Sequence, residues 1–381
     1  MHRPLAVSVV LALVAGLASA AALVGRQAAR GNTQAVRSPI TVVGVSPTIA
    51  APAAPAPPPV PLPPRPVPVP RPTGPVAMAG CPPPPSPPRP PSGPRWRPAV
   101  LVPEIELPAP RPAGARVVSL EPMMGKGMWL WKYPSTEGGD ADAIVAKAVG
   151  AGLHQLWVRV GDSKDGFYAA DTLAQLVPKA HEHHLSVMGW GFPYLYDPVS
   201  DGAWTAAAVR WRGPEGDGLD GFSPDLETAS EGVAVSDLRI SVYLGLVRAT
   251  LGDRPLVATV FRPTDPFWAS YPYRAIAPYA DGFAAMVYWG CAEPGAAAVE
   301  ALQRLSTLRP VHLIGQGYNM ADEGGRQVPP SGDETWRFLD VARSGGAVGA
   351  SFWDWQEIDS EQWGAMAQYP WPAPRPQGRV G

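Results

Sequence analysis

The sequence has little cysteine and histidine, and it lacks several motifs of common chemistries. Its 381 residues include six histidines and two cysteines, Cys81 and Cys291. Two cysteines do not support a disulfide framework, and no Cys or His spacing is typical of a zinc site. No G-x-x-x-x-G-K-[ST] loop and no G-x-S-x-G elbow occurs, which argues against nucleotide binding and serine-esterase chemistry. We therefore expect neither a metal nor a cofactor.

Lysine is absent from residues 1–116, which carry 11 arginines and only two acidic residues. Their formal charge is +9, whereas residues 117–381 carry 20 basic and 31 acidic side chains. Residues 117–381 therefore have a formal charge of −11, and the whole chain has a formal charge of −2. An acidic folded part is a poor binder of nucleic acid, so we expect no nucleic-acid partner.

Proline is abundant but concentrated, because 27 of the 50 prolines fall in residues 51–112. Such a density excludes central strands and helix interiors, so the chain cannot be one compact domain. We predict a disordered, proline-rich tether over 31–116, favouring polyproline II. Residues 117–371 are enough for one large domain, and 372–381 are predicted to be a disordered tail.

Residues 1–30 have the features of an export signal. Arg3 precedes an apolar run from Leu5 to Leu17, and Ala18-Ser19-Ala20 forms a small-residue cleavage site. The alternative is an uncleaved membrane anchor, because the apolar stretch continues to Val24 and is about 20 residues long. Either reading predicts a secreted or membrane-anchored protein of the cell envelope.

Apolar runs alternate with amphipathic stretches through the predicted domain. This alternation predicts an α/β fold, a (β/α)8 TIM barrel. An open doubly wound sheet is the alternative, but no glycine-rich loop follows the first strand. The expected strands are Gly127–Trp131, Gln155–Val160, Leu185–Trp190, Gly221–Leu226, Leu256–Phe261, Gly282–Trp289, Val311–Gln316 and Ala347–Trp355. The expected helices include Ala141–Ala151, Leu173–His183, Ser236–Leu251, Ala297–Leu308 and Asp333–Ser344.

The fourth expected strand ends in two carboxylates, Asp225 and Glu227. Side chains alternate along a strand, so Ser223, Asp225 and Glu227 share one face. Chemistry in such barrels takes place at the carboxyl ends of the strands. Two adjacent carboxylates cannot both ionise freely, so one pKa should rise, as a general acid requires. The alternative is that they cap the following helix. Pro224 lies between them and predicts a bulge or bend.

Tryptophan supplies the second candidate feature, since flat indole faces suit the apolar faces of sugar rings. Trp157 is expected to fill the core. Asp162, beyond the second strand, is a reserve carboxylate or an ordinary turn residue. Asp354 should point toward the outer helices if Trp353 points inward. The expected substrate-binding tryptophans, for which core packing is the alternative, are Trp129, Trp131, Trp190, Trp289, Trp353 and Trp355.

The fourth-strand segment resembles glycoside hydrolase family 18, the chitinase-like barrels. That family carries Asp-Gly-apolar-Asp-x-Asp-x-Glu at this place, and the present chain departs from it at Ser223, where the family has its middle aspartate. The Asp-x-Glu pair is also similar to family 25 muramidases, which cleave peptidoglycan. The matching residues are Asp220, Gly221, Phe222, Asp225 and Glu227.

Two further segments resemble family 18. Met286-Val287-Tyr288 is similar to a Met-x-Tyr sequence on the sixth strand, although Trp289 follows where the family has Asp or Asn. Trp353 is similar to the tryptophan on the barrel floor. The resemblance implies that Glu227 protonates the leaving oxygen, that Asp225 orients a substrate acetamide acting as nucleophile, and that Tyr288 hydrogen-bonds this acetamide.

Together these patterns predict a monomeric, exported glycosidase that acts on a polysaccharide or peptidoglycan containing N-acetylhexosamine. The alternative is a catalytically inactive barrel that binds glycans and attaches the protein to the cell wall. A third hypothesis is a wall-spanning structural protein whose barrel is only a cap.

Overall fold

The computed structural model describes residues 74, 76, 78–81, 100–102, 117–323 and 325–372. The predictions for residues 1–30, and for nearly all of the tether and the tail, lie outside these residues. None of the helices in the described part combines the length and apolarity that a membrane span requires.

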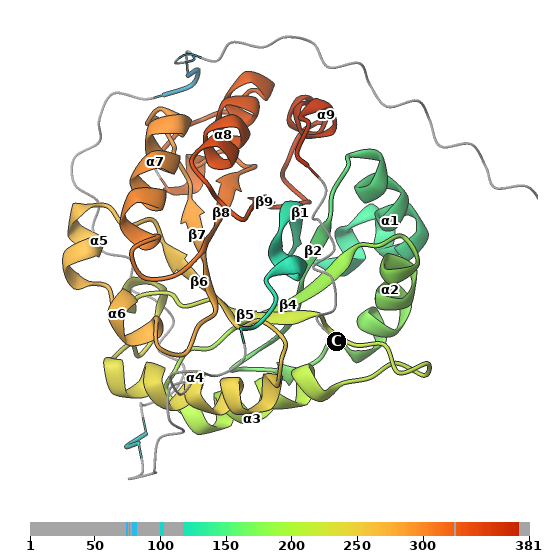
Figure 1. The fold of residues 1–381 in the computed structure, drawn as a ribbon, viewed down its shortest axis with the longest axis vertical. Helices are drawn as coiled ribbons and strands as arrows, with labels where there is room; N and C mark the ends of the chain where they lie inside the picture. Colours follow the sequence, from blue (N-terminus) through green and yellow to red (C-terminus); the bar gives the residue numbers. More distant parts are fainter. Residues whose placement is uncertain are drawn as a thin grey trace, which may run out of the picture. The chain divides into compact units, whose positions relative to one another are not determined.

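Eight parallel strands form a ring in the order β5-β4-β2-β1-β9-β8-β7-β6 (Figure 1). Single bridges from Phe222 to Leu256 and from Asp225 to Thr259 join β5 to β6 and bring the ring close to closure. The short β3 pairs antiparallel with β2. The strands are β1 (Gly125–Leu130), β2 (Gln155–Asp162), β3 (Gly166–Phe167), β4 (Ser186–Phe192), β5 (Gly221–Pro224), β6 (Val257–Phe261), β7 (Gly282–Val287), β8 (Val311–Gln316) and β9 (Gly349–Trp353).

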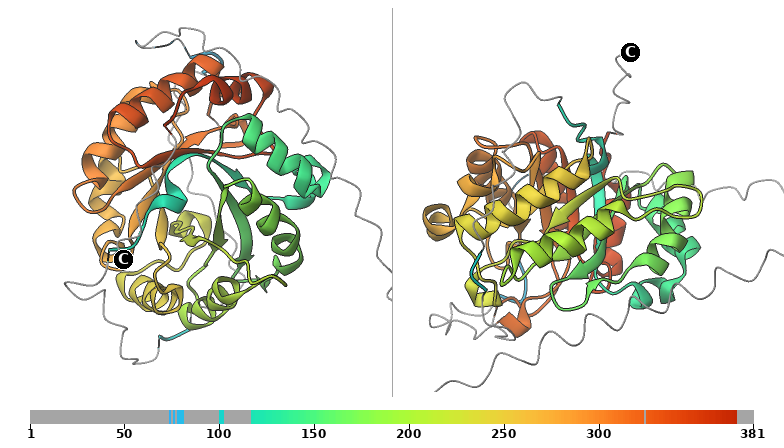
Figure 2. Two further views of the ribbon diagram at one scale, coloured as in Figure 1. Left: turned by 45° about the vertical axis from the view of Figure 1, so that its right-hand side comes forward. Right: turned by 90° about the horizontal axis from the view of Figure 1, so that it is seen from below.

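Helices surround the ring, as the two further views show (Figure 2). Several begin at acidic or hydroxyl caps, and Ser331 and Asp359 each form a reciprocal capping box. The helices are α1 (Ala141–Gly150), α2 (Ala170–Glu182), α3 (Pro198–Arg210), α4 (Asp237–Leu251), α5 (Asp265–Ser270), α6 (Tyr273–Ile276), α7 (Pro294–Leu305), α8 (Gly332–Ser344) and α9 (Ser360–Gln368), with short 3-10 turns η1 (Glu121–Met123), η2 (Tyr133–Ser135), η3 (Glu137–Gly139), η4 (Ala229–Glu231) and η5 (Ala321–Glu323).

This architecture confirms the predicted (β/α)8 barrel. All eight expected strands are present, and their observed ends differ from the expected ones by at most two residues. The strand containing Pro224 ends at that proline instead of forming the predicted bulge. The register irregularity lies in β2, between Arg159 and Gly161.

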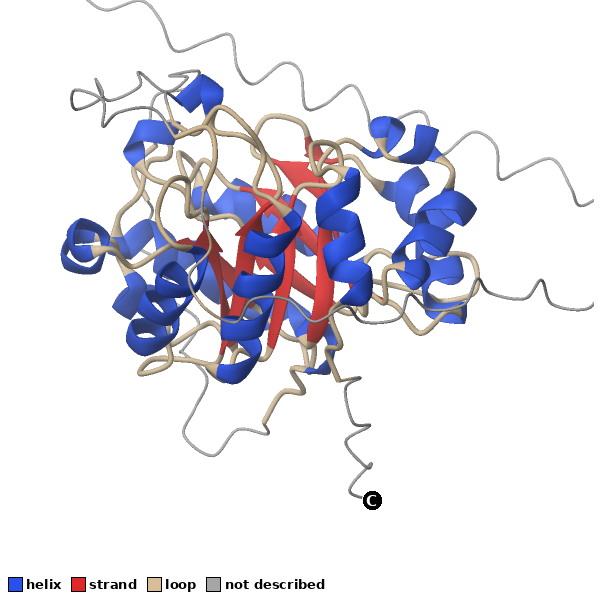
Figure 3. Cartoon of the chain, turned by 90° about the horizontal axis from the view of Figure 1, so that it is seen from above, coloured by secondary structure: helices blue, strands red, loops and turns tan. Residues whose placement is uncertain are grey.

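Side chains that point alternately to the two faces of each strand form two separate apolar cores. Outward residues such as Leu156 and Val158 of β2 pack in the layer between strands and helices, whereas Trp157 belongs to a separate cluster inside the ring. Trp157 is fully buried and stacks on Trp129 at 4.7 Å between ring centroids, which confirms its core role. Figure 3 shows the strands enclosed by helices. The ring is therefore a packed core, as barrels of this size require.

Candidate active site

Asp225 follows β5 and is held between the two neighbouring strands. Its N–H donates to the carbonyl of Gly191 at 2.9 Å, and the residue bridges to Thr259 of β6. The next N–H, of Leu226, donates to the carbonyl of Thr259, while the Leu226 side chain is fully buried in the outer core. These contacts fix the chain that carries Asp225, two residues before the partly exposed Glu227.

Burial and nearby negative charge raise the pKa of both carboxyls. Burial raises the pKa of Asp225 to about 7, Glu231 adds to this rise, and the Arg159 guanidinium opposes it. Burial also raises the pKa of Glu227 well above its usual range, with the charges of Asp225, Glu231 and Glu323 adding to it. The pair therefore retains a proton near neutral pH, as proton donation to a leaving group requires.

Tyr288 follows β7 and shares the electrostatic environment of the carboxyl pair. Burial raises the pKa of the Tyr288 hydroxyl strongly, and Tyr318, Asp225 and Glu227 raise it further. Its ring packs edge-on against Tyr318 at 5.6 Å between centroids. The structure thus brings together Asp225, Glu227 and Tyr288 at the carboxyl ends of the strands, which we call the mouth.

Four of the expected tryptophans meet inside the ring beneath the mouth. Trp353 lies 5.2 Å from Trp190 and 6.0 Å from Trp129 between ring centroids, and 6.1 Å from Trp131. Trp129 and Trp190 are each only 1% exposed, whereas Trp131 and Trp353 keep part of their surface accessible. Trp131 and Trp353 can therefore contact a sugar, and the other two support them from below.

The remaining two tryptophans lie in the outer core. Trp289 packs against Phe338 and points its indole N–H toward Glu334 of α8. Trp355 packs edge-on against Trp363 of α9. Both are nearly fully buried, so neither offers a face to a ligand at the mouth.

Asp162 occupies a turn. Its Oδ1 accepts hydrogen bonds from the N–H groups of Lys164 and Asp165, and its Oδ2 accepts one from Arg159 at 3.0 Å. These bonds match the turn alternative that the sequence left open for this residue.

Asp354 was expected to point toward the outer helices if Trp353 points inward, and its side chain is fully buried. Because β9 ends at Trp353, side-chain alternation does not continue through Asp354, and the peptide bond between these two residues is cis. Oδ1 of Asp354 accepts from the N–H groups of Gln356 and Glu357. Burial and Glu357 raise the pKa of Asp354 to about 6. Asp354 is thus a buried carboxyl that holds the turn after β9.

Sequence reasoning also missed Arg159 and Tyr318. The Arg159 guanidinium carbon lies 5.4 Å from the Trp190 ring centroid, and its charge acts on Asp225. Alternation from the inward Trp157 could have identified Arg159, because two positions separate them. Tyr318 stands two residues beyond the end of β8 and donates to Glu323 at 2.9 Å.

Ser223 lies below Asp225, where family 18 has its middle aspartate. Its hydroxyl lies 2.7 Å from the hydroxyl of Thr259 and donates to the backbone carbonyl of Val257. A neutral hydroxyl pair therefore replaces a carboxyl at this level of the ring. Among the described residues, no group of three His, Cys, Asp or Glu side chains is arranged to hold a metal.

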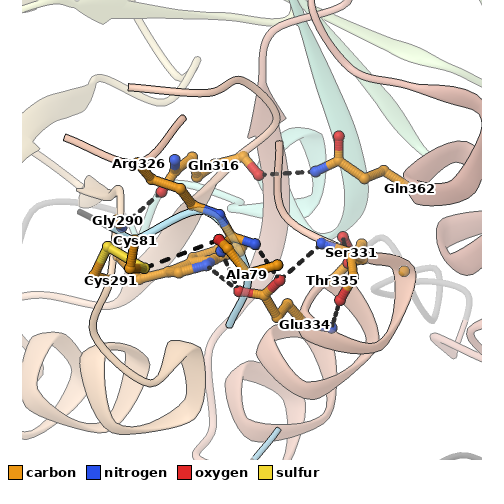
Figure 4. Close-up of polar contacts among 12 residues, drawn as sticks. Ala79, Cys81, Gly290, Cys291, Gln316, Arg326, Ser331, Glu334, Thr335 and Gln362 are labelled. Carbon is orange, nitrogen blue, oxygen red and sulfur yellow. Dashed lines mark hydrogen bonds and ion pairs between the residues drawn. A yellow bond between two sulfur atoms is a disulfide. The ribbon is translucent and has the colours of Figure 1, made fainter. Parts of the chain in front are cut away.

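The two cysteines form a disulfide, which corrects our expectation that they would not pair. Cys81 bonds to Cys291 in the loop after β7, with 5.7 Å between their Cα atoms (Figure 4). The adjacent Gly80 carbonyl accepts from the N–H of Gln327 in the loop after β8. A short piece of the proline-rich segment is therefore attached to the barrel, through a cysteine that lies three residues after Tyr288.

A buried ion pair supports the same two loops. Arg326 and Glu334 form two parallel hydrogen bonds, one of them at 2.8 Å between Nη2 and Oε2 (Figure 4). Their side chains are 1% and 0% exposed. Glu334 also accepts from the N–H of Ser331, and the N–H of Gly290 donates to Gln316 at 2.8 Å. The ion pair thus fixes the loop after β8 to α8, and the partly buried bond from Gly290 to Gln316 joins the loop after β7 to the end of β8.

No protein-family model matches this chain, and no curated protein is similar to it in sequence. Its fold is similar to that of solved structures. The C-terminal domain of the "putative chitinase" of Desulfitobacterium hafniense is 12% identical over 65% of this chain and 99% of that domain, with a TM-score of 0.50.

Two other solved structures are similar at lower scores. The spore cortex-lytic enzyme SleL of Bacillus cereus is 13% identical over 65% of this chain and 74% of that one, with a TM-score of 0.48. The family 18 chitinase of Cycas revoluta is 10% identical over 64% of this chain and 98% of that one, with a TM-score of 0.48. The structure from Desulfitobacterium hafniense, at a TM-score of 0.50 and 12% identity, shows that the fold is similar and carries no conclusion beyond the fold.

Proposed function

We propose that this protein is an exported glycoside hydrolase that cleaves polymers containing N-acetylhexosamine. The observation that carries the proposal is the pair Asp225 and Glu227, whose raised pKa values and position beside Tyr288 suit acid catalysis over an aromatic floor. The same barrel fold in a "putative chitinase" is consistent with it. The disulfide supports export, because such bonds persist in oxidising compartments.

In the proposed reaction, Glu227 donates its proton to the glycosidic oxygen as that bond breaks. The carbonyl oxygen of the substrate acetamide forms the new bond to the anomeric carbon. Asp225 accepts a hydrogen bond from the acetamide N–H. Water then attacks the anomeric carbon, and the bond from this carbon to the acetamide oxygen breaks, which restores the acetamide. The water gives a proton to the Glu227 carboxylate, which restores the acid. Tyr288 would hydrogen-bond the acetamide, and Trp353 would support the sugar ring.

One observation favours a second function, a barrel that binds glycans without cleaving them. Ser223 and Thr259 place neutral hydroxyls below Asp225. Neither hydroxyl can do what a carboxyl at that position would do, which is to exchange a proton with Asp225. A binding barrel of this kind would attach the protein to the cell wall and would still use the faces of Trp131 and Trp353.

We predict that the purified chain releases reducing ends from chitin oligomers or peptidoglycan, with the β-configuration at the new anomeric carbon. Two successive displacements, the first by the acetamide, restore the original configuration. Early product can be analysed by proton NMR. The matched control is a β-1,4-glucose oligomer, which lacks the acetamide and should stay intact. Initial release of the α-anomer would contradict the proposal, and binding without turnover would support the second function.

A further inference from the structure

A chain of hydrogen bonds runs through the inside of the ring, below the accessible tryptophans. The indole N–H of Trp129 donates to Oγ of Ser351 at 2.8 Å, and this oxygen lies 2.8 Å from Nε2 of His312. Nδ1 of His312 lies 2.8 Å from the carbonyl oxygen of Met123 in η1. Ser351 and His312 are 0% exposed, and Trp129 is 1% exposed. We call these three bonds the buried chain.

The chemistry of the groups determines the direction of every bond in the buried chain. An indole nitrogen can only donate, and a backbone carbonyl can only accept. Nδ1 of His312 therefore carries the proton that it donates to Met123. Nε2 of the neutral ring is then an acceptor, and the hydroxyl of Ser351, which already accepts from Trp129, donates to it. Burial lowers the pKa of His312 to about 4, which agrees with a neutral ring.

The buried chain ends on the rings that carry Trp353, the tryptophan at the mouth. Trp129 stacks on Trp157 at 4.7 Å between ring centroids and lies 6.0 Å from Trp353. His312 also contacts Trp157 directly, at 5.1 Å between centroids. Trp353 packs against this inner cluster and keeps part of its surface accessible. The accessible ring therefore lies on buried rings that hydrogen bonds hold in place.

A core that needed only volume would not use these polar side chains. Burying a hydroxyl or an imidazole is unfavourable unless its donors and acceptors are paired, but a fully paired network favours a single arrangement of side chains. The backbone also leaves room for the imidazole, because a Cβ atom at Gly349 would lie 2.7 Å from Nδ1 of His312. The buried chain thus specifies orientation in addition to filling space.

We propose that His312 and Ser351 are positioning residues for glycan binding. Through Trp129 they hold Trp353 in the one orientation that presents its accessible face to a sugar ring. A ring that is already ordered loses little conformational freedom when a ligand binds. If Trp353 could adopt several orientations, the affinity would fall in proportion to the fraction that is competent to bind. This inference rests on the proposed binding of glycans at the mouth, but not on the cleavage step.

The first variant is Ser351→Ala, which removes the acceptor for Trp129 and the donor for His312 at the loss of a single heavy atom. Binding of an N-acetylglucosamine oligomer is measured by calorimetry on the full-length chain that carries Glu227→Gln, which prevents turnover. We expect Ser351→Ala to weaken this binding about tenfold, because a smaller fraction of the chain then has Trp353 in the competent orientation.

The matched control is Thr205→Val in the same background. The hydroxyl of Thr205 in α3 lies 3.1 Å from the hydroxyl of Tyr243 in α4, and both residues are 0% exposed in the outer layer. This variant also breaks a buried hydrogen bond, so thermal unfolding should show that both variants lose stability. Thr205→Val should leave the affinity unchanged. Equal weakening of binding by both variants would overturn the inference, since a general loss of stability would then explain it.

Nitrogen-15 NMR supplies a readout that a loss of packing elsewhere does not move. In the native chain, His312 should show a protonated Nδ1 and an unprotonated Nε2. The indole proton of Trp129, assigned by its loss in Trp129→Phe, should exchange slowly with solvent. Ser351→Ala should shift this signal and speed its exchange, whereas Thr205→Val should not. An Nδ1 of His312 without a proton would contradict the buried chain.

The outcomes separate this inference from the proposed function. If the oligomer binds equally well with and without Ser351→Ala, the positioning role is wrong and the glycosidase proposal stands. If the native chain binds the oligomer without cleaving it and Ser351→Ala weakens that binding, the positioning role stands and the glycosidase proposal fails. If the native chain does not bind the oligomer, both are overturned.

Discussion

Replacing Glu227 by glutamine is expected to lower turnover of an N-acetylhexosamine polymer by about 10²- to 10⁴-fold. Glutamine keeps the shape of the side chain but has no proton to donate to the leaving oxygen. Binding should be retained, because Trp131 and Trp353 are unchanged. Initial rates and calorimetric affinities on the same oligomer measure the two effects separately, with Glu215→Gln as the control for an unrelated lost charge. Unchanged turnover would refute the role of Glu227.

A stability measurement on the same variant separates lost chemistry from misfolding. The pKa of Glu227 is raised in the folded protein, so its ionisation costs stability as pH rises through that pKa. The glutamine variant avoids this cost. It should therefore melt at a higher temperature than the native chain at about pH 8, and the difference should shrink at about pH 3, which lies below the ordinary pKa of a glutamate side chain. A variant that melts lower at about pH 8 would show that the substitution damages the fold.

Replacing Arg326 by methionine is expected to lower the free energy of unfolding by about 3–5 kcal/mol. The substitution leaves the Glu334 carboxylate, which is 0% exposed, buried without its counter-charge. The cap of α8 depends on the same carboxylate, since Glu334 accepts from the N–H of Ser331. Urea unfolding followed by circular dichroism measures the change.

Two further variants serve as controls for this prediction. Arg326→Met combined with Glu334→Gln should recover much of the loss, because no buried charge then remains. Lys179→Met removes one partner of an exposed pair with Asp142 and should cost no more than about 1 kcal/mol. Equal losses for Arg326→Met and Lys179→Met would contradict the role given to burial.

The sequence was sufficient for the ring of strands but not for every helix. All eight strands were expected because each is a short apolar run between turns. Helix α3 was missed because its buried residues, such as Asp201, Trp204 and Ala208, lie around much of its circumference and form no single apolar stripe. Helices α5 and α6 were missed because they span only six and four residues.

The carboxyl pair could be identified because the bridge from Asp225 to Thr259 continues the parallel pairing beyond β5, so side-chain alternation still applies there. The rest of the mouth depends on where loops fold. Asp354 lies beyond the last residue of β9 and bonds to the following turn, so alternation along the strand does not determine its direction. The disulfide joins cysteines that are 210 residues apart, one of them in a proline-rich segment without periodicity, so no local pattern indicated the pairing.

The central claim is that a substrate acetamide binds between Asp225 and Tyr288 with Glu227 beside the cleaved bond. A crystal structure of the Glu227→Gln variant with an N-acetylglucosamine oligomer tests it directly. We predict the acetamide nitrogen within hydrogen-bond distance of Asp225, its oxygen near the anomeric carbon, and the sugar ring over Trp353. An oligomer bound elsewhere, or one whose acetamide points away from Asp225, would contradict the account.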